Sequence, residues 1–135
     1  MKHTGIWIDK DKAHIVTIEN GVETYNTVLS NVDHYKPHGG SGTRLKGGPQ
    51  NVVQDSKYLE RENHQLKQYY NSIASEIKNT DALVIYGPGN TNEKLRKELH
   101  ENHKSLSKKI KGVKKADNMT DNQVKALVRD FFELN

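Results

Sequence analysis

A glycine-rich, basic segment over residues 38–50 has the residue types best suited to holding a charged ligand. It reads His38-Gly39-Gly40-Ser41-Gly42-Thr43-Arg44-Leu45-Lys46-Gly47-Gly48-Pro49-Gln50 and holds five of the ten glycines. Glycine lets backbone amides approach a ligand without hindrance from a Cβ, and Arg44 and Lys46 can neutralise phosphate. The segment does not match a Walker A loop, because Lys46 precedes its glycine pair. Ordering so much glycine is entropically costly, so we expect a flexible, glycine-rich loop over residues 33–54.

A run of lysines is the second chemical feature. Residues 104–115 contain six lysines and no acidic residue, in a chain whose net charge is +4. Two basic segments on a slightly acidic body indicate a polyanionic partner such as RNA, although a lysine run can also be only a solvated surface. The candidate RNA-binding residues are Arg44, Lys46, Lys108, Lys109, Lys111, Lys114 and Lys115.

The other polar candidates suggest weaker sites. Asp9 ends the first expected strand, where a metal-dependent nuclease places a carboxylate, but the later strands end without acids. The turn over residues 87–90 precedes a helix and can bind an anion or serve only as a tight turn. His100 and His103 have the spacing of a ligand pair without an evident third ligand. The sequence therefore predicts no metal and no cofactor.

Length and composition indicate a single domain over residues 1–135. No apolar run approaches the roughly 20 residues of a membrane span, and the N-terminal residues do not resemble a signal peptide. The sequence has no cysteine, which suits a reducing compartment. We therefore expect a cytoplasmic protein without a membrane partner.

The first third of the sequence predicts three strands. Residues 4–9, 13–18 and 22–32 are rich in β-branched and aromatic residues. The dipeptide Asn20-Gly21 favours a two-residue hairpin turn, because both residues tolerate positive φ. These signals together predict an antiparallel meander.

A long amphipathic helix is expected over residues 56–78, followed by an almost continuous apolar strand over residues 81–86. Residues 90–93 match a capping box that would open a helix ending near residue 102. A weaker strand is expected over residues 106–113, and a second capping box at residues 120–123 would open a final amphipathic helix. The order βββ-loop-α-β-α-β-α predicts an α/β fold with a ribonuclease-H-like mixed sheet and helices packed on it.

Three motifs in this order resemble the central domain of archaeal and eukaryotic class I release factors and of Pelota, and the bacterial single-domain relatives of that domain. The first is the glycine-rich segment, which lies after the third strand and before a long charged helix. The second is the start of that helix, Lys57-Tyr58-Leu59-Glu60-Arg61-Glu62-Asn63-His64. The third is the apolar strand with its turn, Ala82-Leu83-Val84-Ile85-Tyr86-Gly87-Pro88-Gly89. The resemblance covers nearly the whole chain and implies the ribonuclease-H-like fold called translational machinery component.

The resemblance also implies a function and a site. In the release factors a Gly-Gly-Gln tip enters the peptidyl transferase centre, where its glutamine helps position the water that hydrolyses peptidyl-tRNA. Carried over, the catalytic tip is Gly47, Gly48 and Gln50, whereas Pro49 departs from the Gly-Gly-Gln pattern and removes one amide N–H. The implied partner is the ribosome or tRNA. The implied role is that of a peptidyl-tRNA hydrolase, a ribosome-rescue factor or a non-catalytic occupant of the same site.

Two alternatives stay open from the sequence. The chain could be a non-catalytic protein-interaction module whose loop grips a protein partner or a second copy of the chain. It could also be a metal-dependent nuclease that uses Asp9. The sequence does not indicate the oligomeric state.

Overall fold

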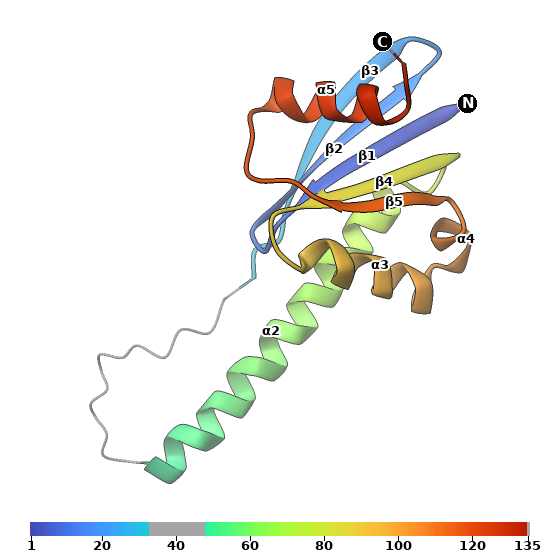
Figure 1. The fold of residues 1–135 in the computed structure, drawn as a ribbon. Helices are drawn as coiled ribbons and strands as arrows, with labels where there is room; N and C mark the ends of the chain where they lie inside the picture. The colour runs from blue at the N-terminus through green and yellow to red at the C-terminus, as the bar shows by residue number, and fades with distance from the viewer. Residues whose placement is uncertain (33–47, 135) are drawn as a thin grey trace.

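The computed structural model describes the backbone of residues 1–32 and 48–134 and the side chains of residues 1–32 and 60–134 (Figure 1). Within these residues, five strands form one mixed sheet in the order β3-β2-β1-β4-β5. Their bounds are β1 Lys2–Ile8, β2 Lys12–Glu19, β3 Val22–Leu29, β4 Ala82–Gly87 and β5 Ile110–Lys115. The first three strands are antiparallel neighbours, whereas β4 is parallel to β1 and β5 is parallel to β4. The prediction of an α/β fold with a mixed sheet is confirmed. The ribonuclease-H-like assignment stays a prediction.

Two tight turns set the register of the meander. Asn20 and Gly21 have φ values of 53° and 80°, as the predicted hairpin requires. At the other turn, the Asp9 carboxylate accepts hydrogen bonds from the backbone N–H groups of Asp11 and Lys12, both at 2.8 Å. This side chain therefore stabilises the turn between β1 and β2.

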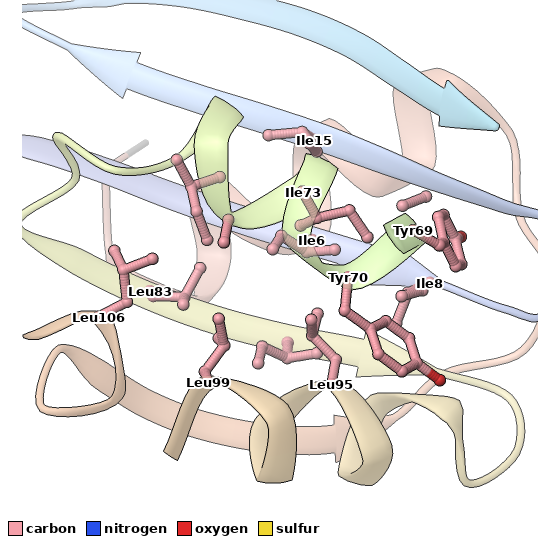
Figure 2. Packing of buried hydrophobic residues seen from close by; sticks show 14 residues of the cluster. Ile6, Ile8, Ile15, Tyr69, Tyr70, Ile73, Leu83, Leu95, Leu99 and Leu106 are labelled. Carbon is pink, nitrogen blue, oxygen red and sulfur yellow. The ribbon is translucent and has the colours of Figure 1, made fainter. Parts of the chain in front are cut away.

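Helices cover both faces of the sheet. Helices α2 (Gly48–Glu76), α3 (Thr91–Asn102) and α4 (Lys104–Ser107) lie on one face, and α5 (Asp121–Phe131) lies on the other (Figure 1). Figure 2 shows how strand residues meet the helices on the first face. The packed side chains there include Ile6, Ile8, Ile15, Leu83, Tyr69, Tyr70, Ile73, Leu95, Leu99 and Leu106. Each fully buried large apolar side chain of this kind contributes about 1.5–3 kcal/mol.

The apolar strand and the second capping box are confirmed. Every residue of β4 is buried, because helices lie on both of its faces. At the start of α5, Thr120 accepts a hydrogen bond from the Gln123 N–H while the Gln123 side chain accepts from the Thr120 N–H. The α5 stripe then buries Val124 and Val128.

Three local predictions were wrong. Helix α2 begins at Gly48 rather than Ser56, so residues 48–54 of the predicted loop are helical; proline is tolerated in a first helical turn, where its missing N–H is not needed. Leu106 lies in α4 rather than in a strand, because its side chain is buried on the face of the sheet that α2 and α3 cover. Asn90 makes no side-chain cap, and the Asn92 side chain instead accepts from the Glu93 N–H at 2.8 Å.

Helix α2 extends well beyond the sheet (Figure 1). Among its described side chains, residues 60–68 are exposed or half-buried, and the buried ones lie from Tyr69 to Ala74, in the last two turns. The distance from Gly48 to Leu66, the first of the described α2 side chains packed on the core, is about 27 Å along the helix at 1.5 Å per residue. No helix among the described residues has the length and apolarity to cross a membrane.

Candidate nucleic-acid interface

The predicted basic residues of the C-terminal half gather on the edge strand β5 and the turn that precedes it. Lys104, Lys108, Lys111, Lys114 and Lys115 are exposed, and Lys109 is half-buried. Within the described part of the chain, none of these six lysines forms an ion pair with a carboxylate. Their charges are therefore available to a polyanion in solution.

An irregularity in the β4–β5 ladder changes how these lysines are displayed. Leu83 pairs with Ile110 and Val84 pairs with Gly112, so Lys111 is an extra residue in a bulge. Gly112 lies under α5, where an added Cβ would approach the Phe131 ring to 3.0 Å. Farther along the strand, Lys114 Nζ lies 5.9 Å from the centroid of the Phe131 ring, a weak cation–π contact.

The carboxyl end of β5 lies beside the start of α3. Gly87 is the Cα partner of Lys115, and an added Cβ on Gly87 would lie 2.5 Å from the Ile8 carbonyl oxygen. Asn92 in the first turn of α3 donates from its side chain to the Lys114 carbonyl at 2.9 Å. The positive end of the α3 dipole therefore adds to the lysine charges at this corner of the sheet.

A hydrogen-bonded network that was not predicted from the sequence holds the residues after β5 in place. Trp7 donates its indole N–H to the carbonyls of Ala116 and Asp117, each at 3.1 Å. The Trp7 ring stacks on His14 with centroids 5.6 Å apart. The residues that follow Lys115, the last lysine of β5, are thus held by hydrogen bonds to β1 in the middle of the sheet.

The network continues from His14 to the first turn of α5. The Tyr25 hydroxyl lies 2.7 Å from His14 Nδ1 and donates to the Asp121 carboxylate at 2.8 Å. Burial, reinforced by Lys12, lowers the pKa of His14, and Asp121 acts in the opposite direction. The direct β1–β2 pairing of Trp7 with His14 follows from the hairpin register, but the meeting with Asp121 requires α5 to dock.

Two of the three predicted tip residues, Gly48 and Gln50, lie at the N-terminal end of α2, which extends away from the sheet (Figure 1). Gly48 and Gln50 belong to the first turn of the helix, and the Gln50 side chain is outside the described part. Gly47, Arg44 and Lys46 lie outside the described residues altogether. Of the candidate site residues, the structure therefore brings together the five lysines of positions 108–115 and separates Gly48 and Gln50 from them.

Asp9 and His103, the candidates for a metal site, form hydrogen bonds within the fold. Both turn amides beside Asp9 use its carboxylate, and the described residues contain no group of three His, Cys, Asp or Glu side chains placed to hold a metal. His103 Nε2 lies 2.9 Å from Asn71 Oδ1 on α2. These contacts account for Asp9 and His103 structurally.

Comparison with solved structures shows which proteins have a similar fold. The chain superposes on Pelota from Thermoplasma acidophilum with a TM-score of 0.56 at 19% identity, over 96% of this chain and 32% of that one. Pelota from Archaeoglobus fulgidus gives 0.56 at 9% identity, over 98% and 36%. An archaeal translation termination factor gives 0.54 at 9% identity, over 98% and 40%. No protein-family model and no curated protein matches the chain.

At these low sequence identities, the similarity to the three proteins shows a shared fold. It confirms the expected similarity to a domain found in Pelota and in an archaeal termination factor. The chain spans well under half of the length of each of these proteins.

Proposed function

We propose that this protein acts in translation, by binding ribosomal RNA or tRNA through the basic edge formed by β5 and its preceding turn. The proposal is carried by one observation: the five lysines of positions 108–115, without carboxylate partners among the described residues, lie on β5 and its preceding turn in a fold shared with a translation termination factor. Lysine–phosphate contacts supply affinity without base specificity, which suits docking on a structured RNA.

Helix α2 separates the predicted tip from the core of the domain. Gln50 is about 24 Å along the helix from Leu66, the first of the described α2 side chains packed on the core. A domain held on RNA by its lysine edge would present the segment that contains Gly47, Gly48 and Gln50 at the end of this long helix. Arg44 and Lys46, which precede this helix in the sequence, would add phosphate contacts.

Cosedimentation with ribosomes across a salt series tests the proposal. The native chain is compared with a variant lacking residues 39–47, which leaves α2 intact, and with Lys108, Lys109 and Lys111 replaced by glutamate. Salt-sensitive pelleting that both changes weaken supports the proposal. Absence of pelleting by the native chain even at low salt contradicts it.

Peptidyl-tRNA hydrolysis is the finer proposal. Gln50 would help position the attacking water, as the glutamine of the release-factor tip does. Release of the peptide from peptidyl-tRNA on ribosomes, measured with the native chain and Gln50→Ala, tests this role. Release that the variant abolishes while it still pellets supports a catalytic glutamine. Absence of release with a ribosome-bound native chain leaves a non-catalytic occupant of the site.

The alternative of a protein-interaction module makes the opposite prediction for the lysines. Charge reversal on β5 would then leave partner binding intact, because the glycine-rich segment would make the contact. Pull-down with the native and charge-reversed chains separates the two functions.

A further inference from the structure

The outer strand β3 leaves one edge of the sheet open. Among the described residues no strand lies beyond it. The Ser30 N–H donates to the Asp11 carbonyl at 2.9 Å, in register with the β2–β3 ladder. Hydrogen-bonded pairs alternate along an antiparallel ladder, so the backbone groups of Glu23, Tyr25 and Thr27 point away from β2. Within the described part of the chain, they form a row of donors and acceptors without backbone partners.

Side-chain contacts hold β3 in its strand conformation. Glu23 pairs with Arg129 of α5 at 2.6 Å, and Tyr25 donates to Asp121 of α5. On the opposite face, Asn26 donates to Glu76 of α2 at 2.6 Å. Because the strand is already ordered, pairing with another strand would cost little further entropy. The ion pair also neutralises the one charge that β3 carries.

The β3 edge lacks the features that usually prevent edge-to-edge pairing. It contains no lysine and no proline, and Val22 and Leu29 are 63% and 61% exposed. The β5 edge, in contrast, carries lysines and a bulge, so two copies would repel each other there. Beside β3, a groove of about 510 Å³ lies over β2 and β3, so α2 leaves room on this face.

We propose that two copies of the chain pair through β3 as antiparallel strands about a two-fold axis at Tyr25. A two-fold axis perpendicular to the sheet places the same face of both copies on the same side. Residues that lie opposite each other must then point to the same face, so their residue numbers differ by an even number. An axis at Tyr25 places Val22 opposite Val28 of the partner subunit and Glu23 opposite Thr27 of the partner subunit. An axis at Glu23 would instead bring two carboxylates face to face.

Sedimentation equilibrium of the full chain tests the pairing. The native chain, with a mass of 15.4 kDa, should sediment at twice that mass and dissociate on dilution. Val22→Lys places an ammonium group against an apolar partner and should raise the dissociation constant about tenfold or more. Because Val22 is exposed in the single chain, circular dichroism should show an unchanged fold. Ser105→Lys, which adds the same charge at the exposed α4, should leave the dimer unchanged.

Cysteine cross-linking tests the register directly, because the native chain contains no cysteine. Val22 and Val28 would form a non-hydrogen-bonded pair, whose Cα separation suits a disulfide. The double variant Val22→Cys with Val28→Cys should yield covalent dimers on mild oxidation, whereas Val22→Cys alone should not. A native chain that remains monomeric at every concentration, a dimer insensitive to Val22→Lys, or equal cross-linking of the single and double variants would overturn the proposal.

Discussion

Replacing three exposed lysines by glutamine tests the lysine edge most directly. Lys108, Lys111 and Lys115 are exposed and have no carboxylate partner among the described residues. Their replacement therefore removes charge without breaking an ion pair of the described fold. Changes in RNA affinity can then be assigned to lost phosphate contacts.

The expected magnitude follows from counterion release. Each phosphate contact with single-stranded RNA contributes about 0.7 to the slope of log K against log salt, so three lost contacts flatten the slope by about 2. At roughly 0.1 M salt this corresponds to about a hundredfold loss of affinity, or close to 2.8 kcal/mol. The loss should shrink toward zero as the salt concentration approaches about 1 M.

Fluorescence anisotropy with a single-stranded RNA oligonucleotide across a salt series measures both quantities. The matched control replaces Lys10, Lys67 and Lys78, three exposed lysines away from β5, by glutamine. It changes the net charge by the same amount and should shift affinity only slightly. Equal losses in both variants would show that net charge, and not the edge, governs binding. An unchanged slope in the β5 variant would refute the phosphate contacts themselves.

Three further predictions concern stability. Gly5→Ala should lower the free energy of unfolding by about 1–3 kcal/mol in urea titration, because the added Cβ would lie 2.2 Å from Val128 Cγ2; an unchanged midpoint would contradict this packing. Tyr70→Phe removes a buried hydroxyl without a partner, whose pKa burial raises to about 12, so thermal unfolding should show unchanged or higher stability by up to about 1 kcal/mol. Because burial lowers the pKa of His14 in the folded state below its usual 6.5, the unfolded state binds the proton first as the pH falls. The native chain should therefore lose more thermal stability than His14→Gln between about pH 7 and pH 5, and parallel losses would exclude this origin.

The predictions that succeeded rest on short-range signals. The Asn20-Gly21 turn and the Thr120 capping box depend on backbone preferences within four residues, and both are present. The apolar run of β4 predicted burial on both faces, and the meander with its following helices and strands predicted the mixed sheet. These elements sufficed for the fold class.

The local errors arose where equivalent signals compete. The glycine pair and Pro49 suggested that the loop continued, yet proline is also compatible with the first turn of a helix, and α2 begins at Gly48. The residues around Asn90 match a capping box, but Asn92 caps locally instead and binds β5. The hydrogen bonds that the Asn92 side chain forms depend on β5, which lies about 20 residues farther along the chain and so outside a local sequence pattern.

The sequence alone determines the lysine composition of the candidate interface, the sites of two turns and the order of the secondary-structure elements. Sheet order and helix docking determine the remainder: the lysines lie on an outer strand of the described sheet with Lys111 in a bulge, and Trp7 donates to the carbonyls of Ala116 and Asp117. The physical reason is range. Turns and caps are stabilised by bonds within a few residues, whereas contacts across about a hundred residues exist only after the sheet has brought distant segments together.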